Sequence, residues 1–174
     1  MAAPRFVDQL NAQIGNELAA HHQYLACAIY YDALTMPRMA TFFYAQALEE
    51  RGHALMMVQY LLDTDGQVVI PEVQAPVPAF EGVVAPVELA LDQERRVTEQ
   101  INGLLRIARD ETDFASEQFL QWFVKEQVEE VATMSDLLAV VRRNVDDVEN
   151  IEEYVAREQG GGTTESGAPR TAGG

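Results

Sequence analysis

Four long stretches of this sequence repeat apolar residues at intervals of three and four, which is the period of an amphipathic α-helix. They cover residues 6–33, 37–63, 86–110 and 114–144. A helix with one apolar face is stable only when that face packs against other elements, and four such helices suffice for a bundle. The sequence therefore predicts an all-α protein built as a four-helix bundle.

The second and third stretches are separated by a segment that cannot be helical. Pro71, Pro76, Pro78 and Pro86 lie in or at the end of it, and proline removes helical hydrogen bonds. About 20 extended residues can run the ~40 Å length of a helix of ~27 residues. We therefore expect one long crossover, which lets the second and third helices run parallel.

The C-terminal part of the chain divides into two regions. A shorter amphipathic stretch at residues 146–158 predicts a fifth helix. Residues 159–174 are mostly glycine and small polar residues with almost nothing apolar to bury, so we expect a disordered tail. A length of 174 residues suits a single domain. The predicted domain therefore covers residues 1–158.

Charge and cysteine content limit the partners and the compartment. The chain has 28 acidic and 12 basic residues, a net charge of -16, which favours cations and argues against binding nucleic acid. No apolar run approaches the ~18 residues of a membrane span, and no secretory signal is recognised at the N-terminus. Cys27 is the only cysteine. A cytoplasmic location without membrane contact is expected.

Acidic and amide residues interrupt the apolar face of every long stretch. The interrupting residues are Glu17, then Glu50 and His53, then Glu94, and finally Gln127 and Glu130. Carboxylates brought together in a core repel one another unless positive charge compensates them. Lys125 is the only lysine, and no arginine falls on these faces. Bound metal ions would neutralise these carboxylates. The alternative is that the assigned helix phases are wrong by one residue and the glutamates face solvent.

The ligand types favour particular metals. Carboxylates with one imidazole suit iron or manganese better than zinc, which prefers more nitrogen and sulfur. An arrangement bridged by Glu50 leaves Glu17 and His53 for one ion, and Glu94 and Glu130 for the other.

Three further glutamates and a tyrosine stand next to these ligands in the helical pattern. Glu49, Glu126 and Glu129 could form a third, looser metal position, or simply a solvated acidic face. Tyr24 lies two turns after Glu17 on the same face. It is placed to hydrogen-bond a ligand or donate an electron, and an ordinary core tyrosine is the alternative.

Four sequence segments together form a specific combination. They are QIGNELAAHHQY (residues 13–24), ALEERGH (47–53), LDQERRVTE (91–99) and FLQWFVKEQVEEV (119–131). In these segments the chain resembles the bacterial non-haem ferritins, and its long tail is similar to those of the actinobacterial type. The resemblance implies a ferritin-like bundle with one long crossover and a short fifth helix.

The resemblance also implies a function. Ferritins of this kind oxidise Fe(II) with O2 or hydrogen peroxide at a di-iron ferroxidase centre inside each subunit, and store ferric mineral in a hollow shell of 24 subunits. The implied ligands of the first iron are Glu17, Glu50 and His53. Those of the second are Glu50, Glu94 and Glu130, with Gln127 close by. Glu49, Glu126 and Glu129 match a third metal site, and Tyr24 and Trp122 match residues beside the centre.

Three alternatives differ in their requirements. The haem-binding bacterioferritins carry a second Glu-x-x-His in the fourth helix and a methionine after the glutamate of the second. This chain has Glu130 and Arg51 at those positions, so no haem is expected. A di-iron oxidase or oxygenase needs an apolar substrate pocket beside the metals. A purely structural bundle binds no metal.

Overall fold

The computed structural model describes residues 2–158 and 167–173, and within them it contains helices and no strand. The helices are α1 (Pro4–Ala33), α2 (Pro37–Asp63), α3 (Ala85–Asp110), α4 (Phe114–Arg143) and α5 (Val148–Glu158). Every boundary lies within two residues of the predicted one, because the period of apolar residues and the flanking prolines mark the ends. The predicted all-α class and the fifth helix are confirmed.

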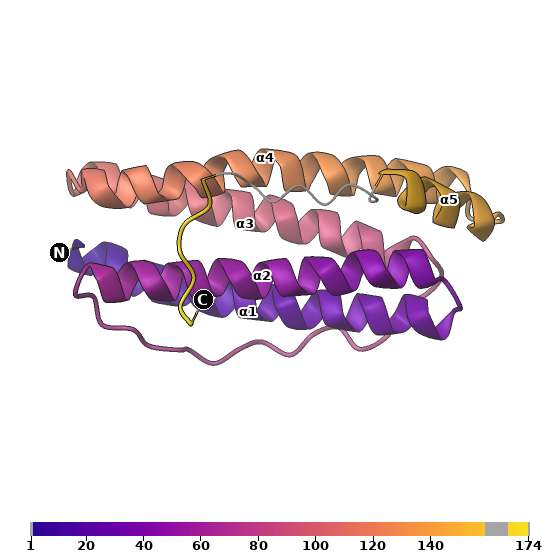
Figure 1. The fold of residues 1–174 in the computed structure, drawn as a ribbon, viewed down its shortest axis with the longest axis horizontal. Helices are drawn as coiled ribbons and strands as arrows, with labels where there is room; N and C mark the ends of the chain where they lie inside the picture. Colours follow the sequence, from indigo (N-terminus) through magenta and orange to yellow (C-terminus); the bar gives the residue numbers. More distant parts are fainter. Residues whose placement is uncertain (1, 159–166, 174) are drawn as a thin grey trace.

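The long helices form two antiparallel pairs that pack face to face (Figure 1). One pair is α1 with α2, and the other is α3 with α4. Residues 64–84 form the crossover, which runs along the α1–α2 pair from one end of the bundle to the other. The second and third helices therefore run parallel, as the proline-rich segment predicts.

Side chains of α1 hold the crossover in place. The Asn11 amide donates to Gln67 O at 2.8 Å and accepts from Val69 N–H at 2.8 Å. A methyl group on Gly15 would lie 2.5 Å from Pro71 Cγ, which is closer than side chains approach one another. The glycine inside α1, a mild penalty for helix formation, thus allows the crossover to lie against the bundle.

Left-handed residues end three of the helices. Thr35, Asp65 and Thr112 have φ values of 60°, 54° and 56°. After Asp65 the Gly66 N–H donates to Leu61 O at 2.8 Å, which closes the last turn of α2 in a Schellman-type arrangement. Gly66 follows the turn, and the left-handed conformation itself falls on Asp65.

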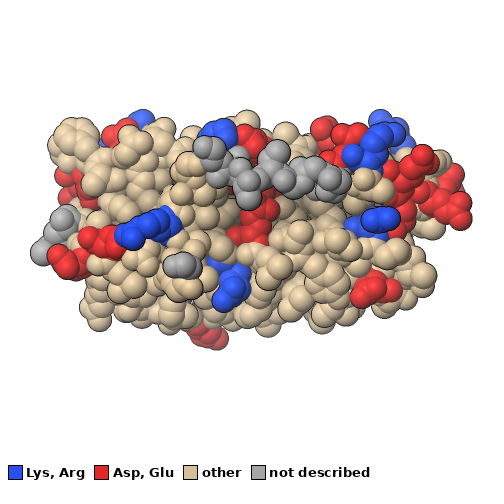
Figure 2. Space-filling view, in the orientation of Figure 1, with Lys and Arg blue, Asp and Glu red and all other residues tan. Residues whose placement is uncertain are grey.

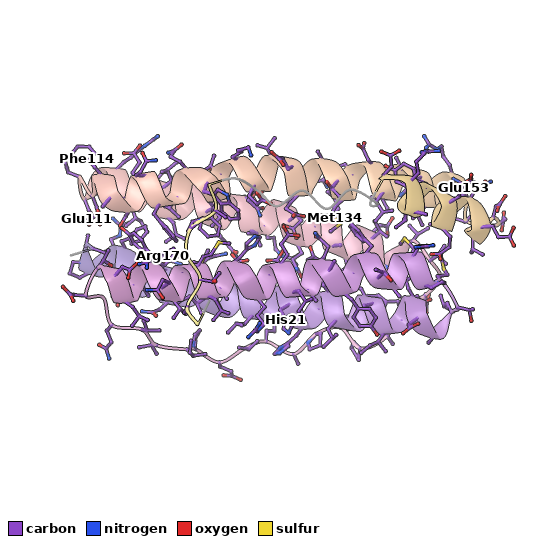
Figure 3. All side chains as sticks on the ribbon, in the orientation of Figure 1. His21, Glu111, Phe114, Met134, Glu153 and Arg170 are labelled. Atoms are coloured by element: carbon purple, nitrogen blue, oxygen red, sulfur yellow. The ribbon has the colours of Figure 1, made fainter. Side chains whose placement is uncertain are left out.

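The apolar core consists of two clusters, one towards each end of the bundle. The cluster near α5 includes Tyr31, Phe43 and Met134, the last of which lies between the two helix pairs in Figure 3. The other cluster includes Phe6 and Met57. On each long helix, the carboxylates singled out by the sequence fall between the residues of these two clusters. The acidic centre is therefore a layer between two apolar layers.

The C-terminal segment follows a path that composition does not predict. Residues 167–173 cross α2, where Ala172 N–H donates to Leu55 O at 3.1 Å and Arg170 pairs with Asp63 at 2.8 Å (Figures 1 and 3). We predicted disorder for residues 159–174. Residues 159–166 and 174 lie outside the described residues, whereas residues 167–173 have defined partners.

The surface carries acidic side chains in distinct groups. Figure 2 shows them gathered at the end of the bundle formed by α5, which includes Glu149, Glu153 and Glu158. Among the residues described, no helix combines the length and hydropathy that crossing a bilayer requires.

Candidate metal centre

The first three predicted ligands come together between α1 and α2. Glu50 and His53 are one turn apart on one face of α2, and Glu17 reaches them from α1. One ligand atom from each lies within 4.8 Å of the others. His53 Nδ1 is 3.3 Å from Glu50 Oε2 and 3.9 Å from Glu17 Oε2. All three residues are 2% exposed or less, so this group is fully interior.

The other helix pair supplies its carboxylates to the same interior. Glu94 of α3 is buried, and its two oxygens accept hydrogen bonds from the Tyr24 hydroxyl and from Gln127 Nε2, the latter at 3.4 Å. Glu130 of α4 is also buried. The predicted residues of all four long helices thus face inward, and the alternative of a shifted helix phase is wrong for these four glutamates.

The two halves differ in how tightly their ligands are grouped. Glu50, Glu94 and Glu130 do not offer three atoms within 4.8 Å of one another, as the first group does. They nevertheless interact, because the charges of Glu94 and Glu130 both raise the pKa of Glu50. The second predicted position is therefore wider than the first in this structure.

Burial dominates the electrostatics of the centre. It raises the pKa of Glu17, Glu50 and Glu130 well above the usual range, and repulsion from neighbouring carboxylates raises each further. Burial also raises the pKa of Glu94 to about 7, although the hydrogen bond from Tyr24 lowers it. A raised pKa favours the protonated form of each carboxyl group, whereas a bound cation favours the ionised form.

Several ligand atoms have no hydrogen-bond partner in the described part of the chain. They are Glu17 Oε2, His53 Nε2 and Glu130 Oε2, all buried. Buried polar atoms are rarely left in this state unless an ion or water serves them. Carboxylate oxygens with one imidazole nitrogen form a donor set that suits Fe(II) and Fe(III). The residues present therefore fit bound iron.

A second compact group lies next to the first. Glu49, His53 and Glu126 also bring one ligand atom each within 4.8 Å of the others. The sequence groups Glu129, not His53, with the two glutamates. Glu129 is 55% exposed in its side chain and pairs with Lys125 at 3.3 Å on the surface. The structure thus brings two of the three predicted residues together and leaves Glu129 apart.

Two neighbours complete the surroundings of Glu17 and His53. Trp122, predicted beside the centre, packs edge-on against the His53 ring with centroids 5.5 Å apart. Gln13 donates from Nε2 to Glu17 Oε1 at 2.7 Å. We assigned Gln13 no role from the sequence. The sequence feature that could have identified Gln13 is its position one turn before Glu17, on a helix face that is otherwise apolar.

Fold and centre together define a class of protein. Four long helices with a crossover after the second, holding carboxylates and an imidazole between them, form a metal-binding carboxylate bundle of the ferritin-like kind.

Family comparison agrees with this class. The family model described as Ferritin-like domain matches residues 7–144, and the chain belongs to the ferritin family, whose members store iron.

Similar proteins carry three related names. The chain is 48% identical to Ferritin BfrB of Mycolicibacterium smegmatis over 98% of its own length and 94% of the relative's. It is 47% identical, over the same shares, to Bacterioferritin BfrB of Mycobacterium tuberculosis. It is 32% identical to the bacterial non-heme ferritin of Staphylococcus epidermidis, over 88% of this chain and 93% of that one. These names include both ferritin and bacterioferritin, so they leave the haem alternative open.

Solved structures show the same fold. An open pore ferritin from Archaeoglobus fulgidus superposes with a TM-score of 0.86 at 30% identity, covering 90% of this chain and 97% of that one. The predicted ferritin-like architecture is therefore confirmed.

Proposed function

We propose that this protein is a cytoplasmic ferroxidase and iron-storage ferritin of the non-haem type. Each subunit binds two ferrous ions among Glu17, Glu50, His53, Glu94 and Glu130, and oxidises them with O2 or hydrogen peroxide. The ferric product is stored as mineral in a hollow shell of 24 subunits. The observation that supports this most strongly is the buried Glu17–Glu50–His53 group, in which Glu17 Oε2 has no hydrogen-bond partner among the described residues and lies 3.9 Å from His53 Nδ1.

Protein side chains contribute to the reaction in four ways. Bound iron favours the ionised form of the carboxyl groups, and their negative charge stabilises Fe(III) more than Fe(II). Two ions held together can give up electrons as a pair, which avoids one-electron products. Gln127 and the Tyr24 hydroxyl hold Glu94 from both of its oxygens. Burial keeps competing water away from the site.

Glu49 and Glu126 provide a third position beside the pair. Their group with His53 is adjacent to the first, because His53 belongs to both. Fe(III) on its way from the centre to the mineral can bind transiently at this third position. Glu129, which is exposed and pairs with Lys125, lies apart from this position.

Absence of haem is part of the proposal. Arg51, exposed on α2, stands where bacterioferritins carry their haem-ligand methionine, and the three histidines are His21, His22 and His53. The alternative of a di-iron oxygenase needs an apolar substrate pocket beside the metals, and the cavity found here does not meet that requirement. A 590 Å³ cavity between α1, α3 and the crossover is lined by as many polar as apolar residues, and none of the proposed iron ligands is among them.

Stopped-flow mixing of metal-free protein with Fe(II) and O2 tests the proposal. A fast oxidation phase at about two irons per chain is expected. Glu50→Ala should abolish that phase, because Glu50 is placed to serve both ions. Glu99→Ala, which removes an exposed glutamate of α3, is the matched control and should oxidise iron normally. An unchanged fast phase in Glu50→Ala would contradict the assignment. Light scattering should give about 24 chains of 19.3 kDa per particle.

A further inference from the structure

Glu17 is held by an amide that the proposed chemistry does not use. Gln13 is 1% exposed, and its Nε2 donates to Glu17 Oε1 at 2.7 Å. The other oxygen, Glu17 Oε2, accepts no hydrogen bond from any residue in the described ranges and lies 3.9 Å from His53 Nδ1. One oxygen of this carboxylate is therefore occupied by an amide, and the other faces the metal position.

The Gln13 amide is itself fixed on both of its atoms. Its Nε2 also donates to Gln100 Oε1 on α3 at 3.1 Å, and its Oε1 accepts from Asn16 Nδ2 at 3.1 Å. An amide that gives both N–H groups to carbonyl or carboxylate oxygens cannot rotate by half a turn without placing oxygen against oxygen. Its donor face is thus held towards Glu17.

The two anchors of Gln13 lie between it and a cavity. Asn16 and Gln100 both line the 590 Å³ cavity between α1, α3 and the crossover, whereas Gln13 lies behind them. Water entering this cavity meets the anchors first. Gln13 and Glu17 do not line the cavity, and both are 1% exposed, so their hydrogen bond is shielded from this cavity.

We propose that Gln13 is a positioning residue for the metal centre. Held by Asn16 and Gln100, it occupies Glu17 Oε1, and it orients Oε2 as the single oxygen that binds the first ion. The inference rests on the proposed function, since it assigns a role in iron binding. Partners that fix a metal-binding side chain from behind typically contribute about 10–100-fold to metal affinity.

Co(II) titration of the metal-free protein, followed by visible absorption, tests this role without relying on turnover. Gln13→Met keeps the length of the side chain but removes its hydrogen bonds. It should weaken Co(II) binding at the first position by about 10–100-fold and alter the Co(II) absorption bands, which report on ligand geometry. Gln100→Met removes one anchor and should weaken binding less. Gln9→Met, on the exposed face one turn earlier in α1, is the matched control and should bind as wild type.

The outcomes are distinguishable. Wild-type affinity and spectrum in folded Gln13→Met would overturn the inference. If Gln13→Met does not fold, Gln100→Met decides, because Gln100 is only partly buried, and a wild-type titration in that variant would overturn the inference as well. A wild-type protein that binds no Co(II), or a Glu50→Ala variant that binds it normally, would contradict the proposed function and not the role of Gln13.

Discussion

One stripe of α2 shows how differently the middle and the ends of this bundle are built. Phe43, Glu50 and Met57 follow one another at two-turn intervals, and each is at most 1% exposed. Phe43 and Met57 belong to the two apolar clusters, whereas Glu50 lies between them with its pKa raised by burial. Burial of the apolar side chains thus stabilises the two ends of the bundle, whereas burial of the carboxylates destabilises the metal-free middle. A bound cation would offset that cost, so the middle is the region suited to binding metal.

The largest effect is expected at the apolar end. Phe43 packs against Tyr24, Tyr31 and Phe42, with the Tyr31 ring stacked at 5.5 Å. Phe43→Ala should lower the free energy of unfolding by about 3–5 kcal/mol, because it leaves a cavity. Denaturant unfolding of the metal-free protein measures this loss. Arg51→Ala, an exposed position of α2, is the control and should change little. A loss below 1 kcal/mol would mean that the cluster is not close-packed.

A smaller effect of opposite sign is expected in the middle. Burial raises the pKa of Glu94 to about 7, so the folded protein favours its protonated form. The stability that this protonated form contributes is fully present below the ordinary pKa of glutamate and is lost as the pH rises through 7. Glu94→Gln cannot ionise, so its stability does not fall with pH in this way. The metal-free variant should be more stable than wild type by about 1–3 kcal/mol at pH 8, with a smaller gain at pH 5.5.

Thermal unfolding at the two pH values, in the presence of a chelator, measures this difference. Glu99→Gln, on the exposed side of α3, controls for the removal of a charge as such. A Glu94→Gln protein that is less stable at pH 8 would show that the metal-free centre is already satisfied, and the contrast between middle and ends would be lost.

The smallest effect on stability is expected at a carboxylate that accepts hydrogen bonds from backbone N–H groups. Glu152 of α5 accepts from Arg38 N–H at 2.8 Å and from Met39 N–H at 2.9 Å, at the start of α2. The N-cap position of α2, Met36, provides no side-chain hydrogen bond of its own. Glu152→Ala should cost about 1 kcal/mol of stability, in line with the loss of a helix cap. Denaturant midpoints measure it.

Glu153→Ala is the matched control for that cap. Glu153 is exposed on the same helix, and Figure 3 labels it at this end of the bundle. Its removal should leave stability nearly unchanged. Equal losses in the two variants would mean that the effect comes from α5 helicity or surface charge and not from capping of α2.

Much of the fold followed from local pattern. Apolar periodicity predicted the helices, and the prolines at positions 71, 76, 78 and 86 predicted where the crossover lies. The inward position of Glu17, Glu50 and Glu94 followed from the same period, because residues one turn apart share a face. Residues 167–173 were not predictable in this way, since their contacts with Leu55 and Asp63 are made by segments distant in sequence.

By itself the sequence determined which residues face the interior, because helical phase depends only on spacing along one chain. Tertiary structure alone decided which of them meet. It joined His53 to Glu49 and Glu126, left Glu129 with Lys125 on the surface, and placed Gln13 between Glu17 and Gln100. Those contacts depend on the distance and rotation between packed helices, which are set by all the side chains between them and not by the period of any one helix.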